Sequence, residues 1–420
     1  MMYNKTVLDN SLRVITSTMP HSHSVSIAFL TGTGSCYENQ EETGISHFIE
    51  HLCFKGTQRR PTAKEISQDI EGVGGIINGS TDKEATIFWC KVASSHFSIA
   101  LDVLSDLLLN SRFDDADIEK ESQVVIEEIK MNLDLPQHRV NMLIDELLWP
   151  EQPLGREVAG TKETVSSINR GQIQSYIAHH YVPNNTVVSI AGDIQHSEAV
   201  AHIETLLSKW PAGGLSSGYI TNDKQIEPRL RIASKNGEQV HLCLAVHGFS
   251  RFHPQRFALD LLNTVLGGGM SSRLFTEIRE HKGLAYDIHS YVEHFADSGS
   301  FITYAGVDPG KIETAVGAIL EELSKLKQGI TPNELTRAKE LSKGRLLLHL
   351  EDSRNMALWL GSQELLTQRI LNIDEVISII DAITMSDLSQ VAEELLTSGR
   401  LNLAMVGPIK HEPSVKLLKV

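Results

Sequence analysis

The sequence predicts an α+β protein made of two homologous α/β domains in tandem, and three observations lead to this prediction. The chain has 420 residues, which is too long for a single ordinary hydrophobic core. The same order of elements occurs twice, roughly 210 residues apart, as in a domain duplication. Between the two copies, residues 211–228 are rich in Gly, Ser and Pro and lack periodicity, as is typical of a linker. We therefore expect domains over residues 1–210 and 229–420.

Each predicted domain begins with two strands and closes on a third. Both openings contain two β-rich runs around a turn, Pro-His in the first half and Asn-Gly in the second. A helical stretch follows each opening, and each half closes on a β-rich run that ends before Gly. The repeated elements are residues 12–30, 44–55 and 185–193 in the first half, and 229–249, 255–266 and 401–408 in the second. Strands and helices are mixed within both halves, which indicates the α+β class.

Composition and charge limit the partners and the compartment. Apolar residues make up 41% of the chain, enough for sizeable cores, and the net charge of −15 argues against nucleic acid or an anionic membrane as a partner. The four cysteines are isolated, which fits a reducing compartment better than a disulfide framework. The N-terminus lacks the apolar core of a signal peptide, and no apolar run reaches the ~18 residues that span a bilayer. We expect a cytoplasmic protein, with export by a non-classical route left open.

The helix predicted over residues 44–55 carries an unusual polar face. Its apolar stripe, at the spacing of one helical face, consists of Ile45, Phe48, Ile49 and Leu52. His47, Glu50 and His51 cluster roughly opposite that stripe. Two histidines four residues apart can bind one metal ion, and HxxEH is the inverted form of the HExxH zinc motif. The alternative interpretation is a solvated polar face, and two histidines alone leave a zinc site one protein ligand short.

A second helix, predicted over residues 118–133, offers carboxylates for a third ligand. Glu121 and Glu128 lie seven residues apart, two turns along one helical face. Val124 and Val125 are predicted to share this face, which would place the carboxylates among apolar neighbours. Burying an unpaired carboxylate is expensive, and a metal ion would remove that cost. The alternative is a half-exposed helix whose glutamates are all solvated.

The spacing of these residues resembles a known signature. The pattern His47-x-x-Glu50-His51, with Glu128 following His51 by 77 positions, is similar to the signature of the pitrilysin/insulinase metallopeptidases. Other stretches also resemble this family, in particular its mitochondrial-processing-peptidase-like branch, and the likeness extends over nearly the whole chain. These stretches read GISHFIEHLCFKGT at residues 44–57, PLGREVAGT at 153–161, YVPNNTVVSIAGD at 181–193 and GGGMSSRLFTEIREHKGLAY at 267–286.

The resemblance implies a zinc endopeptidase with two homologous α+β domains per chain. Matched position by position, His47, His51 and Glu128 correspond to the zinc ligands, and Glu50 corresponds to the general base. Glu121 corresponds to a second glutamate that supports the site from behind the ligands. Zinc would polarise the scissile carbonyl and acidify a water, whose proton Glu50 would pass to the leaving amine. Peptides or unfolded polypeptide segments are the implied substrates.

The resemblance also implies residues of the first half that hold the substrate. Residues 77–92 end in an alternating strand, and in the family an edge strand near this position pairs with the substrate as an added strand. An Asn-Ala pair precedes that strand in the family and corresponds here to Asn78 and Gly79, so only the Asn matches. Without the resemblance, Asn78 is an ordinary turn residue.

In the second half, the resemblance points to Arg279 and Tyr286. They lie seven residues apart and match an Arg/Tyr pair that contacts substrate in the family, where such groups can hold carbonyl oxygens as negative charge develops. Interpreted alone, they are structural residues of a helix and a strand. One departure concerns specificity: processing peptidases recognise Arg through acidic residues at positions that are His138 and Met142 here. Arg specificity is therefore not carried over.

The resemblance also bears on assembly, because one chain of this branch is half of the four-domain shell that longer relatives build. The chain carries both the zinc motif and the Arg/Tyr pair and so needs no distinct partner for either. We therefore expect a homodimer, the commonest oligomer of soluble chains. Two other functions stay open. One is a non-catalytic structural subunit, although such members typically lose the HxxEH motif. The other is metal storage, in which Glu50 would have no role.

Overall fold

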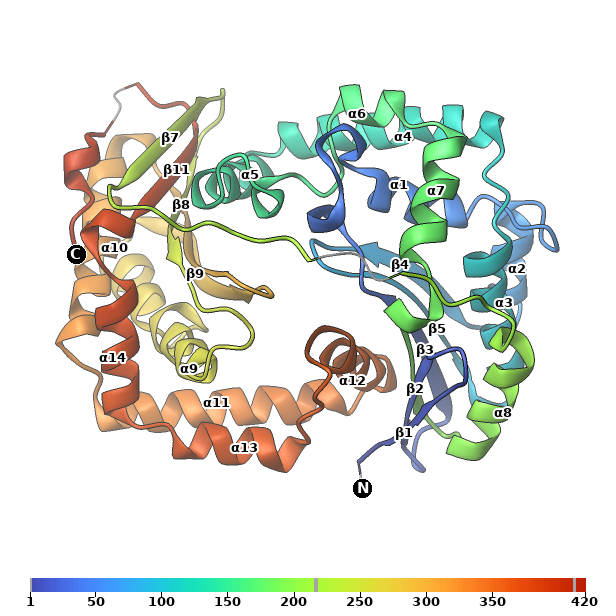
Figure 1. Cartoon of the computed structure of the whole chain (residues 1–420). Helices are drawn as coiled ribbons and strands as arrows, with labels where there is room; N and C mark the ends of the chain where they lie inside the picture. Colours follow the sequence, from blue (N-terminus) through green and yellow to red (C-terminus); the bar gives the residue numbers. More distant parts are fainter. Residues whose placement is uncertain (1, 215–217, 411–412) are drawn as a thin grey trace. The chain divides into compact units, whose positions relative to one another are not determined.

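The computed structural model describes residues 2–214, 218–410 and 413–420, so residues 215–217 of the predicted linker lie outside the described chain. The chain divides into two compact units (Figure 1). Unit 1 consists of Met1–Ile129, Glu157–Tyr219 and Leu347–Asn372, and unit 2 of Lys130–Arg156, Ile220–Leu346 and Ile373–Val420. Each unit therefore comes mainly from one half of the chain and includes a segment of the other half. Within the described ranges, no helix is both long and apolar enough to cross a membrane.

Unit 1 is built on a six-stranded sheet with the order β1-β2-β6-β3-β5-β4. Strands β2 and β6 run parallel, and the other neighbours are antiparallel. The strands are β1 (Asn4–Val7), β2 (Arg13–Thr18), β3 (Ser24–Thr31), β4 (Ile76–Thr81), β5 (Thr86–Ala93) and β6 (Thr186–Gly192). Strands β3 and β6 are buried along nearly their whole length, because helices cover both faces of the sheet.

The helices of unit 1 are α1 (Ile45–Cys53), α2 (Ala63–Glu71), α3 (Phe97–Asn110), α4 (Asp115–Asp134), α6 (Lys162–Ser167), α7 (Arg170–His180), α8 (His196–Leu207) and α12 (Ser353–Thr367). The last residues of α4, from Lys130, are assigned to unit 2. Several helices of unit 1, among them α1, α3, α8 and α12, pack against strands of this sheet (Figure 1). Apolar residues of α1, α3 and α8 join alternate strand residues such as Ile27 and Phe29 in one core. On the other face, the Ser353 hydroxyl of α12 lies 2.9 Å from that of Ser26. Gly361 of α12 packs against Leu30.

Unit 2 repeats this topology. Its five-stranded sheet has the order β7-β11-β8-β10-β9, with β7 and β11 parallel and the other neighbours antiparallel. Matched in chain order, this is the order of unit 1 without β1. The strands are β7 (Arg229–Ser234), β8 (Val240–His247), β9 (Ala285–His294), β10 (Gly299–Val307) and β11 (Asn402–Gly407). The predicted α+β fold with two homologous domains in tandem is therefore confirmed.

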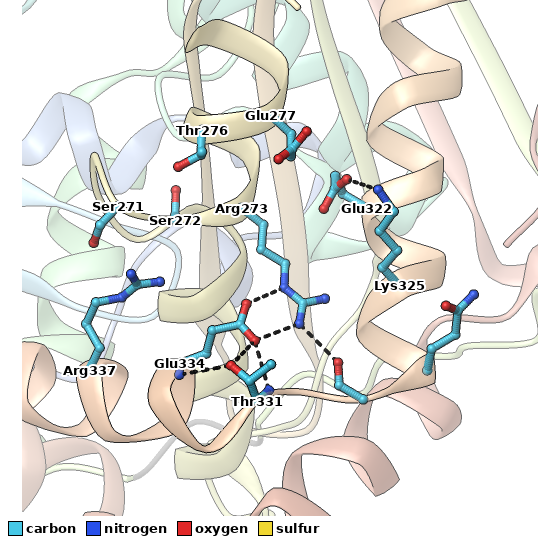
Figure 2. Close-up of a pocket in the computed structure, with 12 residues that line it drawn as sticks. Ser271, Ser272, Arg273, Thr276, Glu277, Glu322, Lys325, Thr331, Glu334 and Arg337 are labelled. Carbon is cyan, nitrogen blue, oxygen red and sulfur yellow. Dashed lines mark hydrogen bonds and ion pairs between the residues drawn. The ribbon is translucent and has the colours of Figure 1, made fainter. Parts of the chain in front are cut away.

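The helices of unit 2 include α5, which lies in the first half of the sequence and packs against β8 and β11. The helices are α5 (Pro136–Leu148), α9 (Arg256–Gly267), α10 (Ile312–Gln328), α11 (Pro332–Leu350), α13 (Ile373–Ala382) and α14 (Met385–Leu395), with a π-helical segment over Phe275–His281. Thr331 and Glu334 cap the start of α11, and Arg273 donates two hydrogen bonds to Glu334 (Figure 2). This network fixes the N-terminus of α11.

Candidate metal centre

Helix α1 carries two of the predicted metal ligands. Its predicted apolar stripe is confirmed, since at most 1% of each residue is exposed for Ile45, Phe48, Ile49 and Leu52. Gly44 precedes the helix with φ +96°, and a Cβ there would lie 2.7 Å from the carbonyl oxygen of Ala159, so the position requires glycine. Glu38 accepts hydrogen bonds from the amides of Gly44 and Ser46. A carboxylate at this end of the helix satisfies the free amides of the first turn.

Helix α4 carries the two carboxylates predicted beside these histidines. Glu121 is buried and Glu128 is partly exposed. The prediction that Val124 shares the buried face is wrong, because Val124 is 45% exposed, whereas Val125 is fully buried. The buried residues of α4 include Ser122, Val125 and Ile129, which share one helical face. At about 100° per residue, Val124 lies to one side of that face.

His47 and His51 of α1 meet Glu128 of α4 at one point. The Nε2 atom of His47 lies 3.8 Å from Oε1 of Glu128, and that of His51 lies 3.5 Å from Oε2. One ligand atom of each residue lies within 4.8 Å of the others. A tetrahedral zinc ion with protein ligands at ~2.0–2.1 Å separates neighbouring donor atoms by about 3.4 Å. The donor set and its spacing therefore fit a zinc ion, with a fourth position left for water.

The two imidazoles differ in their electrostatic surroundings. Burial, together with the charge of His51, lowers the pKa of His47 to about 4. His47 is therefore neutral near pH 7, which is the form that binds a metal. Burial also acts to lower the pKa of His51, but the hydrogen bond to Glu121 and the nearby carboxylates outweigh it and raise that pKa. Protons therefore compete with a metal ion mainly at His51.

Glu121 binds Nδ1 of the His51 ring, whereas Nε2 of the same ring faces Glu128. Its Oε1 accepts a hydrogen bond from Nδ1 of His51 at 2.9 Å, and its Oε2 lies 2.6 Å from Nζ of Lys55. Burial acts to raise the pKa of Glu121, but these two partners outweigh it and lower that pKa. A carboxylate on Nδ1 fixes the tautomer that leaves Nε2 free for a metal. By contrast, Nδ1 of His47 is buried and finds no hydrogen-bond partner among the described residues.

Glu50 lies beside the metal group without belonging to it. Its Oε2 accepts a hydrogen bond from the Thr81 hydroxyl at 2.8 Å. Gly79 also lies against it, and a Cβ there would be 2.9 Å from both Cγ and Oε1 of Glu50. Burial raises the pKa of Glu50, although the Thr81 hydrogen bond opposes this shift. A carboxylate with a raised pKa can take a proton from water and release it again.

The alternating strand predicted at the end of residues 77–92 is β5, but it pairs with both β3 and β4 and is therefore not the edge strand. Asn78 and Gly79 do not precede the edge strand but lie on it, because the edge strand of the unit 1 sheet is β4. Asn78 is exposed, and its side-chain oxygen accepts a hydrogen bond from the Gly79 amide at 2.8 Å. An edge strand can pair with an extended peptide through its backbone. The strand that bears Gly79 and Thr81 against Glu50 is therefore also the strand that can accept a peptide.

Arg279 and Tyr286 lie in unit 2, where they contact each other. The Arg279 guanidinium carbon is 5.1 Å from the centre of the Tyr286 ring, within the range of a cation–π contact. Tyr286 is 75% exposed. The metal group belongs to unit 1, so a role for this pair at that group stays a prediction.

Two contacts of the site were not predicted from the sequence. One joins Lys55 to Glu121, and the other joins Thr81 to Glu50. Lys55 follows His51 by four residues, a spacing that places two side chains near each other beside a helix. Helical spacing could therefore have suggested Lys55. The Thr81 contact depends on how β4 lies against α1, which no local pattern of the sequence indicates.

Comparison with known proteins places the chain in a family. Residues 13–162 match the insulinase family (peptidase family M16), and residues 167–342 match the peptidase M16 inactive domain. The chain is 37% identical over 98% of its length to all of the uncharacterized zinc protease YmxG of Bacillus subtilis. It is 38% identical to an uncharacterized zinc protease of Mycobacterium leprae, with 96% of this chain and 91% of the relative covered.

Solved structures share the fold. A protease from Helicobacter pylori has a TM-score of 0.91 and 22% identity, over 97% of this chain and 99% of that protein. A chain of complex III2 from Candida albicans has a TM-score of 0.86 and 19% identity, over 98% of both chains. Identity this low supports the fold alone. The family matches and the zinc-protease relatives, which align along nearly their whole length, show that the chain belongs to the insulinase family of peptidases, family M16.

Proposed function

We propose that this protein is a zinc-dependent endopeptidase that hydrolyses peptide bonds in peptides or unfolded segments. The observation that carries the proposal is the position of Glu50, a half-buried carboxylate that lies beside His47, His51 and Glu128 but outside their metal group. Metal storage needs only the ligands, and a structural subunit needs neither the ligands nor the base. A hydrolase needs both.

The chain's own residues divide the chemistry between them. When bound by His47, His51 and Glu128, zinc supplies a Lewis acid that polarises the scissile carbonyl and acidifies a water molecule. Glu50 takes a proton from that water and delivers it to the nitrogen of the leaving amine. The Thr81 hydrogen bond orients Glu50 for both transfers.

The substrate is an extended backbone segment. Edge strand β4 offers its backbone groups for pairing, and Asn78 is exposed on that strand. Pairing through backbone groups is tolerant of side chains and requires a segment without structure of its own. Peptides and unfolded polypeptides meet this requirement, whereas residues inside a folded domain do not.

We also propose that the working form is a homodimer in which Arg279 and Tyr286 of one protomer serve the metal group of its partner. These two side chains would stabilise the negative charge that develops on the scissile carbonyl oxygen. The test mixes inactive Glu50→Gln with inactive Tyr286→Phe under conditions that exchange subunits. Activity should return, because a mixed dimer regains up to one intact site. No recovery after confirmed exchange would reject the arrangement in trans, and a monomeric mass in solution would reject the dimer.

We place this enzyme in the cytoplasm. The four cysteines are all buried and free in the structure, as suits a reducing compartment. Cell fractionation with an antibody against the full chain tests this assignment. Recovery from the exported fraction would contradict it.

Zinc content and cleavage measured on the same preparation test the enzymatic function. We expect about one zinc ion per chain and cleavage of a quenched extended peptide that stops with a chelator and returns with zinc. Zinc binding without cleavage across a peptide library would favour the non-catalytic subunit instead. A chain that binds no zinc would overturn the proposal.

A further inference from the structure

Lys55 contacts the site without any role in the chemistry described above. Its Nζ lies 2.6 Å from Oε2 of Glu121, whose Oε1 accepts a hydrogen bond from Nδ1 of His51 at 2.9 Å. A continuous line of contacts therefore runs from the Lys55 ammonium through the Glu121 carboxylate to the His51 ring. The other ring nitrogen of His51 faces Glu128, so this line ends at the metal group.

Burial makes Glu121 dependent on both of its partners. Its side chain is 4% exposed, whereas that of Lys55 is 34% exposed. An ionised carboxylate so deeply buried is costly unless charged or hydrogen-bonding groups pair with it. His51 pairs with one oxygen and Lys55 with the other. Without the ammonium, Oε2 of Glu121 loses its charged partner. The carboxylate is then held in this orientation by the hydrogen bond to His51 alone.

The backbone around Lys55 is fixed, which brings its side chain to Glu121. Gly56 has φ +156°, and a Cβ there would lie 2.3 Å from the carbonyl oxygen of Pro61, so the chain is tightly packed at this turn. The next residue, Thr57, donates a hydrogen bond at 2.5 Å to the fully buried Asp106. The position of Lys55 is thus determined before any metal binds.

We propose that Lys55 is a positioning residue that strengthens zinc binding by holding Glu121 against Nδ1 of His51. The inference rests on the proposed zinc site. Lys55 acts through Glu121 and lies outside the metal group.

The sign of the effect separates this role from a simple charge effect. A bare positive charge repels a dication, so on that ground alone the removal of Lys55 would tighten zinc binding. As the partner of Glu121, Lys55 supports a ligand, and its removal weakens zinc binding. Groups that orient metal ligands typically contribute ~10–100-fold to metal affinity, whereas the field of a partly exposed charge is screened by solvent. We therefore expect weaker binding.

The experiment measures the zinc dissociation constant of the full-length chain by competition with a chromophoric chelator. Lys55→Met, which keeps most of the aliphatic stem, should raise the dissociation constant about tenfold. Lys55→Arg, which restores a charged donor, should return it to within about threefold of wild type. Lys91→Met is the matched control, because Lys91 pairs with Asp352 at the same 2.6 Å in unit 1 but away from the site. It should leave zinc affinity unchanged.

A double variant tests whether Lys55 acts through Glu121. Lys55→Met combined with Glu121→Gln should bind zinc no more weakly than Glu121→Gln alone, since the two side chains form one unit. Additive losses, or a Lys55→Met chain that binds zinc as tightly as wild type or more tightly, would overturn the inference. If Lys55→Met melts too low without metal to be measured, Lys55→Gln replaces it under the same criteria. A wild-type chain without zinc affinity would instead reject the zinc site itself.

Discussion

Both units place a helix against the edge strand of the same sheet topology, but they put different chemistry there. In unit 1, Glu50 of α1 accepts a hydrogen bond from Thr81 of β4 at 2.8 Å. In unit 2, Asn263 of α9 accepts one from Ser290 of β9 at 2.6 Å. One contact presents an ionisable carboxylate beside two imidazoles, and the other presents a neutral amide. The duplicated fold therefore decides where a helix meets the edge strand, while the side chains decide whether the meeting point can react.

A second comparison concerns two largely buried carboxylates, Glu121 in unit 1 and Glu334 in unit 2. Glu334 pairs with the Arg273 guanidinium and with Thr331 at the start of α11 (Figure 2). All of these partners are structural, and they fix a helix end. Glu121 also pairs with a cation, Lys55, but its other oxygen holds a predicted metal ligand. The cation stabilises the carboxylate in both places, and the second partner decides what the carboxylate serves.

The largest expected effect is the loss of kcat when Glu50 is replaced, compared with replacement of Asn263, which makes the corresponding contact in unit 2. Glu50→Gln should retain zinc and fold but lose ~10²–10⁴-fold in kcat, because the amide cannot accept the water proton. Asn263→Ala, the matched change in unit 2, should leave kcat unchanged and cost about 1 kcal/mol of unfolding free energy. Steady-state kinetics and urea denaturation check the two expectations. Wild-type turnover by Glu50→Gln would remove the distinction between the helices.

The next largest effect is on zinc affinity, and it compares Glu128, the proposed ligand on α4, with its sequence neighbour Glu127. Glu128→Gln should weaken zinc binding by at least about 100-fold, because it removes a ligand rather than a group behind one. Glu127→Gln should change zinc binding little, because Glu127 is exposed and lies outside the metal group. A chelator competition assay on both variants decides the matter. Equal zinc retention would show that Glu128 is not a ligand.

A smaller effect on kcat is expected when the space between Gly79 and the Glu50 side chain is filled. In Gly79→Ala, the new methyl group would lie 2.9 Å from Cγ and Oε1 of Glu50 and displace that side chain. We expect kcat to fall about tenfold with zinc affinity unchanged, since general-base catalysis depends on position within reach of the water. Ser80→Ala, on the same strand with its side chain exposed, is the control and should retain wild-type kcat. An unchanged kcat in Gly79→Ala would mean that Glu50 has room to move.

The smallest effect is on the pH dependence of the unfolding free energy, and it concerns Glu334, the structural carboxylate of unit 2. Hydrogen bonds from Arg273 lower the pKa of Glu334 to about 2 from an ordinary 4.5. Because the folded pKa lies below the unfolded one, Glu334 stabilises the fold above pH 4.5, and this contribution is lost as the pH falls toward 2. After allowance for solvent screening, Glu334→Gln should cost about 1 kcal/mol of unfolding free energy at neutral pH. Urea denaturation should show the difference from wild type shrinking below pH 4.5; a difference independent of pH would contradict the assignment.

Much of this protein followed from local patterns of the sequence alone. Alternating runs and their repetition predicted the two strands that open each half and the two α+β halves. They did not predict which strands pair, because β6 lies between β2 and β3 and β11 lies between β7 and β8. The apolar stripe of α1 predicted that His47, Glu50 and His51 share its other side, because the direction of a side chain on a helix depends only on its position along that helix. The same reasoning was wrong for Val124, since periodicity gives the direction of a residue around its helix but not which side of the helix its neighbours cover.

The tertiary structure decided which of these elements meet. Helix α12 covers the sheet of unit 1 and α5 that of unit 2, although each lies in the other half of the sequence. The contacts of Lys55 with Glu121 and of Thr81 with Glu50 likewise join different elements. Such contacts depend on how apolar faces pack against one another across the whole unit. Local periodicity does not indicate how elements distant in the sequence pack together. The sequence alone therefore predicted the reacting side chains, while the tertiary fold determined which side chains they contact.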